Sequence, residues 1–171
     1  MNIIKLKGRY IVKLLDRNHK VIREAIIPNG ITDIGKDTLL DIMFHAVSQV
    51  PTWYIGLIDS SGFSALSDND TMASHSGWTE YQNYAPANRV EWQEDSASDQ
   101  SIINPTTAYA EFTIVGNPTL KGLFLASDNI KGGVAGVLWS TALFQNSNVG
   151  GDWSVSDGQT ILIQYGVGVE G

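Results

Sequence analysis

Cysteine is absent from the 171-residue sequence, and proline, with five residues, is scarce. Without cysteine, the chain has no disulfide, no thiol nucleophile and no thiolate ligand for zinc. No apolar run approaches the roughly 20 residues that span a bilayer. The first residues also lack the apolar stretch and small-residue cleavage site of a secretory signal. We therefore expect a globular protein that is made in the cytoplasm of its cell and has no membrane partner.

Basic residues are also few, and they are unevenly distributed. The formal net charge is −7, yet residues 1–23 carry +6 and residues 24–171 carry −13. An acidic body argues against sequence-independent nucleic-acid binding, which needs a basic surface that displaces counterions. We expect no nucleic-acid partner, so the basic N-terminal segment needs another explanation.

The basic segment alternates with a period of two, which predicts a strand. The apolar face of this strand is expected to hold Ile4, Leu6, Tyr10, Val12 and Leu14. The opposite face is expected to hold Lys5, Lys7, Arg9 and Lys13. Gly8 interrupts the apolar face and predicts a bulge. Two interpretations are open: an edge strand whose lysines prevent edge pairing, or an arm whose four basic residues bind an acidic partner.

Turn residues and an apolar stripe organise the next part of the chain. The polar residues 16–20 separate two apolar runs and predict a hairpin, which Pro28-Asn29-Gly30 is expected to end. A helix is predicted at about residues 35–46, with Asp33 as its N-cap. An apolar stripe at helical spacing supports this helix: Leu39, Leu40, Met43, Phe44 and Val47.

Strand patterns dominate after Pro51, with turn signals between short apolar runs. Residues 60–107 are a long polar exception that nevertheless contains several aromatic residues, which usually pack. We expect an ordered excursion there, with a short strand near residues 90–92. The chain is predicted to be a single all-β domain, a β-sandwich or jelly roll with one short helix. Its parts are a basic hairpin or arm over 1–30, a helical connection over 31–50 and the β-sandwich over 51–171.

No motif in the sequence indicates catalysis. His19, His45 and His75 are widely spaced and have no partner at a metal-ligand spacing, so we expect surface positions for the first two and a structural hydrogen bond for His75. Asp68 and Asp70 offer oxygens to calcium, but their loop lacks the glycine and glutamate of an EF-hand. Four further carboxylates show no spacing that defines an acid–base pair: Glu80, Glu91, Glu94 and Asp95. We expect a non-enzymatic protein without cofactor or metal.

Several short motifs follow one another along the chain. They are Trp53-Tyr-Ile-Gly-Leu-Ile-Asp59, Asp70-Thr-Met-Ala-Ser-His-Ser-Gly-Trp-Thr-Glu80, Arg89-Val-Glu-Trp92, Lys121-Gly-Leu-Phe124, Gly136-Val-Leu-Trp-Ser-Thr-Ala-Leu-Phe144 and Asp157-Gly-Gln-Thr-Ile161. In this order they resemble a family of small virion structural proteins of tailed bacteriophages. The likeness covers roughly residues 34–169 and does not extend to the basic hairpin of residues 1–27. Trp53, Trp78, Trp92 and Trp139 are interpreted as packing residues.

The resemblance implies a virion component that is made in the host cytoplasm. The first reading is a capsid decoration (cement) protein that binds the major capsid protein in many copies, as a dimer or trimer. Under this reading we hypothesise that Lys5, Lys7, Arg9 and Lys13 attach it. The alternative is a tail or fibre accessory module that contacts tail proteins and binds a host glycan. That module would stack sugars on Trp78, Tyr81, Tyr84 and Trp92, so exposure of these rings discriminates the two.

Overall fold

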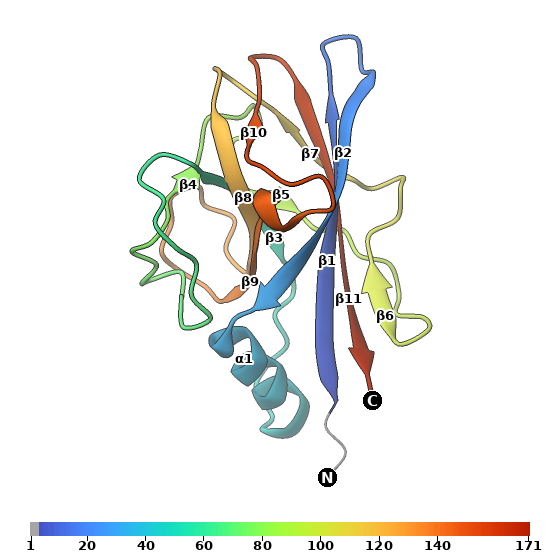
Figure 1. The fold of residues 1–171 in the computed structure, drawn as a ribbon. Coiled ribbons are helices and arrows are strands. Elements are labelled where there is room, and N and C mark those ends of the chain that lie inside the picture. The colour runs from blue at the N-terminus through green and yellow to red at the C-terminus, as the bar shows by residue number, and fades with distance from the viewer. Residues whose placement is uncertain (1–3) are drawn as a thin grey trace.

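The computed structural model describes residues 4–171 as a mostly β protein with one short α-helix (Figure 1). The strands are β1 (Lys5–Leu15), β2 (Val21–Ile31), β3 (Tyr54–Asp59), β4 (Glu80–Tyr81), β5 (Val90–Glu91), β6 (Ser101–Ile103), β7 (Ala110–Thr113), β8 (Thr119–Ala126), β9 (Leu138–Leu143), β10 (Trp153–Ser154) and β11 (Thr160–Glu170). The helices are α1 (Asp33–Phe44) and the 3-10 turn η1 (Phe144–Asn146). The all-β class with a single short helix is confirmed.

Strand β2 connects two groups of antiparallel strands. Its residues up to Asn29 pair with β1, whereas Gly30 and Ile31 pair with β9. The order along the sheet is β4-β3-β8-β9-β2-β1-β11-β6, with β10, β5 and β7 added beside β8, β3 and β11. Buried apolar side chains from both groups form one core, which contains Tyr10, Val12, Ile27, Leu57, Leu123 and Phe112 among others. This arrangement is sandwich-like, and a jelly-roll order is not confirmed.

The basic strand β1 lies inside the sheet and not at its edge. It pairs along its whole length with β11, from Lys5 opposite Glu170 to Leu15 opposite Thr160, and it pairs with β2 from Gly8 onward. The interpretation as an edge strand is therefore wrong from Gly8 onward, where both ladders of β1 are occupied, whereas residues 5–7 pair with β11 alone. The predicted alternation is confirmed along most of the strand: Tyr10 and Val12 are fully buried.

Two local predictions in the first hairpin are also wrong. Gly8 stays in register between Val167 and Asn29, so it forms no bulge. A Cβ at this position would collide with the Asn29 side chain and would lie 2.7 Å from the Tyr165 hydroxyl oxygen, so close packing requires the glycine. Pro28-Asn29-Gly30 does not end the hairpin, because β2 passes there from pairing with β1 to pairing with β9.

Helix α1 is confirmed, but its N-cap differs from the prediction. Thr32 is the N-cap, since its Oγ1 accepts a hydrogen bond from the Gly35 N–H at 3.1 Å. Asp33 instead lies in the first turn, where it pairs with Lys36. Gly35 is the buried residue of the helix and lies close to the backbone of Trp139. The helix therefore contacts the sheet through its N-terminal part, and most of the predicted apolar stripe faces solvent.

The excursion over residues 60–107 is ordered against the body of the protein. It contributes β4, β5 and β6, which confirms a short strand at the expected place. Trp78 packs on Phe124 with ring centroids 5.1 Å apart, and Trp92 packs edge-on against Tyr165 at 5.2 Å. Aromatic contacts thus hold a segment that has little regular secondary structure.

Candidate functional site

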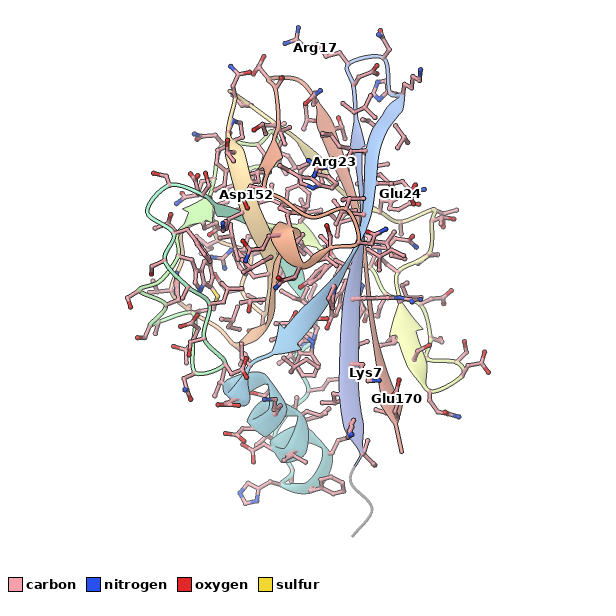
Figure 2. The ribbon with its side chains drawn as sticks, viewed as in Figure 1. Lys7, Arg17, Arg23, Glu24, Asp152 and Glu170 are labelled. Atoms are coloured by element: carbon pink, nitrogen blue, oxygen red, sulfur yellow. The ribbon has the colours of Figure 1, made fainter. Side chains whose placement is uncertain are left out.

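The four predicted attachment residues share the outward face of β1. Lys5, Lys7 and Arg9 are exposed, and Lys13 is half-buried. Lys7 forms an ion pair with Glu170 on β11 (Figure 2), and the Lys13 ammonium lies 3.8 Å from a carboxylate oxygen of Glu24. The structure brings the four side chains together on a sheet face. A partner would therefore dock onto this face, and from Gly8 onward it could not add a strand to β1.

The four rings that the alternative assigned to glycan stacking are buried. Trp78, Tyr81, Tyr84 and Trp92 are 2%, 6%, 4% and 5% exposed. The Trp78 indole N–H donates to Asp70 at 3.0 Å, and the Tyr81 hydroxyl donates to the Val115 carbonyl at 2.6 Å. Because stacking on a sugar requires an open aromatic face, the assignment of these four rings to a glycan platform is wrong.

The remaining polar candidates serve the local structure. Asp70 accepts hydrogen bonds from Trp78 and from the Ser67 N–H, and the Asp68 carbonyl accepts one from the Asp33 N–H. His75 Nδ1 lies 3.0 Å from the Thr71 carbonyl oxygen, in agreement with the expected structural hydrogen bond. Within residues 4–171, no group of three or more histidine and carboxylate side chains is arranged to hold a metal ion.

Glu80, one of the carboxylates considered for acid–base chemistry, belongs to a buried ion pair with Arg89. The two side chains are 4% and 0% exposed. Both carboxylate oxygens of Glu80 accept from the guanidinium, and Oε2 also accepts from the Gly132 N–H at 2.6 Å. Because both of its carboxylate oxygens accept hydrogen bonds from neighbouring groups, Glu80 is a structural residue. The other three carboxylates, Glu91, Glu94 and Asp95, are exposed.

Several large apolar side chains are exposed at the end of the molecule where α1, the start of β1 and the end of β11 lie (Figure 1). Among the large hydrophobic side chains of the described residues, Phe44 is the most exposed, at 81%, and Met43 is 64% exposed. We call the six exposed residues at this end the apolar end patch: Ile4, Leu40, Met43, Phe44, Val47 and Val169. The sequence identifies the helical stripe, but helical spacing alone does not show whether such a stripe is buried or exposed.

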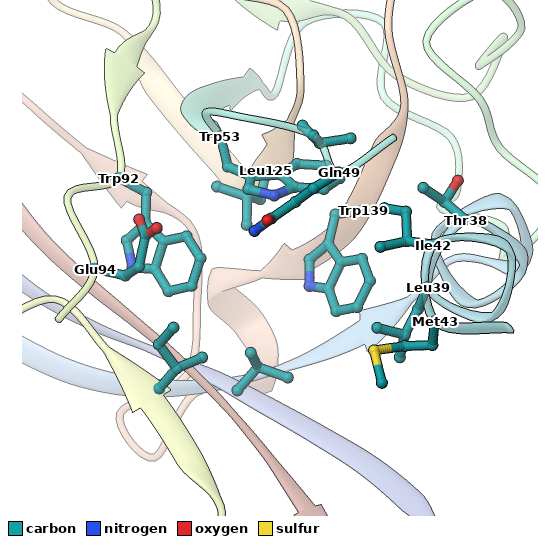
Figure 3. Close-up of a pocket in the computed structure, with 13 residues that line it drawn as sticks. Thr38, Leu39, Ile42, Met43, Gln49, Trp53, Trp92, Glu94, Leu125 and Trp139 are labelled. Atoms are coloured by element: carbon teal, nitrogen blue, oxygen red, sulfur yellow. The ribbon is translucent and has the colours of Figure 1, made fainter. Parts of the chain in front are cut away.

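A hollow of about 360 Å³ opens beside this patch, between α1, the segment that follows it and both groups of strands (Figure 3). Three tryptophans line it, Trp53, Trp92 and Trp139, together with aliphatic side chains of α1 and the strands. The polar lining residues are Thr38, Gln49 and Glu94. Sequence reasoning missed this hollow because its residues come from segments far apart in the chain.

On the core side of the hollow, Tyr165 accepts hydrogen bonds from two of the tryptophans that line it. The Trp139 indole N–H donates to the Tyr165 hydroxyl at 2.7 Å, and the Trp92 indole N–H donates to the Tyr165 carbonyl at 2.9 Å. Burial raises the pKa of Tyr165 to about 12, so its hydroxyl remains protonated at neutral pH. Two indole rings are thereby held with their polar edges inward.

Comparison with known proteins gives no relative of this chain. No protein-family model matches the sequence, and no curated protein or solved structure matches it significantly. Among the described residues, no helix has the length and apolar character needed to cross a membrane.

Proposed function

We propose that this chain is a non-enzymatic virion structural protein of a tailed bacteriophage, a decoration protein that attaches to the major capsid protein. The observation that carries the proposal is the apolar end patch, where Phe44 and Met43 are 81% and 64% exposed. Large apolar side chains exposed at one end of a protein favour a protein interaction site there. The order of sequence motifs supports the choice of a phage virion as its setting.

The basic face of β1 supports a second contact, with an acidic partner surface. Lys5, Lys7 and Arg9 alternate along one strand, so their side chains project from the same face at intervals of about 7 Å. Strand β11 pairs with β1 along the whole row, and β2 pairs with β1 from Gly8 onward. Charges displayed on a rigid ladder steer and orient a partner of opposite sign. We therefore assign the main attachment contact to the apolar end patch, and a second contact to the basic face of β1, which is the face opposite to Ile4.

A decoration protein does not need a large contact on each copy. Many copies on a symmetric shell gain avidity by repetition, and a dimer or trimer would increase this gain. A compact all-β domain with an exposed helix fits such a role. The alternative of a tail or fibre accessory module would use the same patch on a tail protein, so position in the virion separates the two.

Location in the virion is the first test. Immunogold electron microscopy of purified virions, with an antibody against this protein, should show gold over the head in many copies. Gold confined to the tail or its fibres would overturn decoration in favour of the accessory module. Virions without gold, with a positive blot of the infected cell, would overturn the virion assignment itself.

The attachment surface has its own test, with capsids that lack the protein. Met43→Ser/Phe44→Ser should abolish rebinding, whereas the matched control Ile130→Ser/Val134→Ser should bind normally. Ile130 and Val134 are 58% and 62% exposed but lie in the loop between β8 and β9. Lys5→Glu/Lys7→Glu should weaken rebinding, most strongly at low salt. Undiminished rebinding by the patch variant would overturn the assignment of the attachment surface.

A further inference from the structure

The hollow beside α1 has aromatic walls that are locked in place. The rings of Trp53 and Trp139 are 5.8 Å apart and inclined by 58°, and Trp92 stands on the other side of the space (Figure 3). The indole N–H groups of Trp92 and Trp139 are both bonded into the core. Trp92 and Trp139 are 5% and 8% exposed, so each presents only a small area of carbon to the hollow and no free donor. The half-buried Trp53 is the most accessible of the three rings.

The polar lining of the hollow carries negative charge. Glu94 is the one ionisable residue among the lining side chains, and none of them is cationic. Glu94 and Gln49 are both exposed, and neither side chain joins an ion pair or hydrogen bond within residues 4–171. The Thr38 hydroxyl is already used, since it donates to the Ile34 carbonyl at 2.7 Å.

Aromatic faces and a free carboxylate favour the same kind of ligand. The face of an indole ring carries the negative part of its quadrupole and attracts cations within about 6 Å of the ring centroid. A carboxylate at the rim adds direct attraction to the same charge. We infer that this hollow binds a small organic cation, specifically an alkylated ammonium head group with a short apolar tail.

The lining favours an alkylated ammonium over a primary one. A primary ammonium has three N–H donors that must each find an acceptor when water is removed. The lining offers Glu94 and the Gln49 amide oxygen at its rim and otherwise carbon atoms. Methyl groups on the nitrogen need no acceptor and would contact the tryptophan and aliphatic side chains. The volume of about 360 Å³ lies at the lower end of the range for small-molecule sites, which suits a head group of this size.

The direct test compares a cation with its uncharged isostere. Choline and 3,3-dimethyl-1-butanol have the same shape, but carbon replaces the charged nitrogen in the second. Each is titrated into the purified full chain, with tryptophan fluorescence and calorimetry as readouts. We expect choline to bind roughly 3- to 30-fold more tightly. Equal binding of the isostere, or no binding of choline, would overturn the proposal.

Two variants connect the preference for a cation to named side chains. Glu94→Gln should reduce the ratio of choline to isostere affinity, and Trp53→Leu should weaken choline binding. The matched control is Glu91→Gln, which removes an exposed carboxylate that does not line the hollow. An unchanged ratio in Glu94→Gln would contradict the role of its charge. Because Glu94 is exposed, this variant is expected to fold even if Trp53→Leu does not.

A third ligand tests whether the hollow prefers an alkylated ammonium over a primary one. Butylammonium carries a primary ammonium on a short chain, and it should bind more weakly than choline. Stronger binding of butylammonium would overturn the preference for an alkylated nitrogen.

Rebinding of Glu94→Gln to capsids should remain normal, because Glu94 lies outside the apolar end patch. A failure of this inference is thus distinguishable from a failure of the attachment proposal.

Discussion

Arg89 and Glu80 form a two-pronged ion pair in the protein interior. Arg89 Nε and Nη2 donate to Glu80 Oε1 and Oε2 at 3.0 and 2.8 Å. The other guanidinium donors reach the carbonyl oxygens of Asp128 and Gly133, both at 2.9 Å. The pair therefore links the irregular excursion of residues 60–107 to the loop between β8 and β9, and every strong polar group in it has a partner.

Replacing Arg89 by Met should lower the free energy of unfolding by about 3–5 kcal/mol, because it leaves the Glu80 carboxylate buried and unpaired. The double variant Arg89→Met/Glu80→Leu should lose less, since neither charge remains inside. Urea denaturation followed by tryptophan fluorescence measures both. Lys36→Ala is the control: it breaks an exposed pair with Asp33 and should cost under about 1 kcal/mol. A double variant as unstable as the single one would contradict this account.

The glycine at position 8 gives a steric prediction. Gly8→Ala should cost about 1–3 kcal/mol, because the new methyl group collides with the Asn29 side chain and the Tyr165 hydroxyl. Asn29→Ala in the same background should recover part of this loss by making room. The double-mutant cycle is measured by urea denaturation. If the two single losses merely add, the proposed steric conflict is absent.

Local sequence patterns predicted strands and the helix, but not which strands pair with one another. Alternation in β1 depends on burial of one face, which the sequence shows directly. Whether β1 is an edge depends on β11, and Lys5 pairs with Glu170 at the far end of the chain. Pro28-Asn29-Gly30 has strong turn propensity, yet pairing with β1 and β9 overrides it. Tertiary pairing of this kind leaves little trace in a single sequence.

The candidate sites show the same limit. Apolar residues at helical spacing occur on buried and on exposed helix faces. The spacing alone therefore could not show that Phe44 of α1 is exposed to solvent. The hollow unites Trp53, Trp92 and Trp139 from three separate strands or their flanks. Each tryptophan had been interpreted as a packing residue, and each does pack. Only the fold shows that the same rings border a shared space.

The raised pKa of Tyr165 predicts that the free energy of unfolding falls at alkaline pH. Burial raises its pKa from the ordinary value of 10 to about 12. In the unfolded chain this hydroxyl ionises near pH 10, whereas the folded protein keeps the proton until about pH 12. The contribution of Tyr165 is thus complete below pH 10 and is lost as the pH rises toward 12, by up to about 1.4 kcal/mol per pH unit.

Urea denaturation of wild type and Tyr165→Phe, at several values between pH 8 and 11.5, checks this prediction. Tyr165→Phe should be less stable by about 1 kcal/mol at pH 8, because Trp139 loses its hydrogen-bond acceptor. Its stability should nevertheless fall less steeply above pH 10. Parallel curves for the two proteins would show that Tyr165 does not keep its proton in the folded state.

Phe44 and Leu39 lie on one helix, but substitution of Leu39 should destabilise the protein much more than substitution of Phe44. Leu39 packs against the core, so Leu39→Ala should cost about 2 kcal/mol, near the lower limit for a buried leucine. Phe44 is 81% exposed, so Phe44→Ser should change the free energy of unfolding by no more than about 0.5 kcal/mol. Thermal and urea denaturation of the two variants measure this difference.

The same pair of variants tests whether the apolar end patch is available to a partner. Phe44→Ser should reduce the binding of a hydrophobic dye such as ANS, because it removes exposed apolar surface without loosening the fold. If Phe44→Ser instead destabilised the protein as much as Leu39→Ala, the end of α1 would have to pack on the body of the molecule. Phe44 would then be part of the core, and attachment through this patch would lose its physical basis.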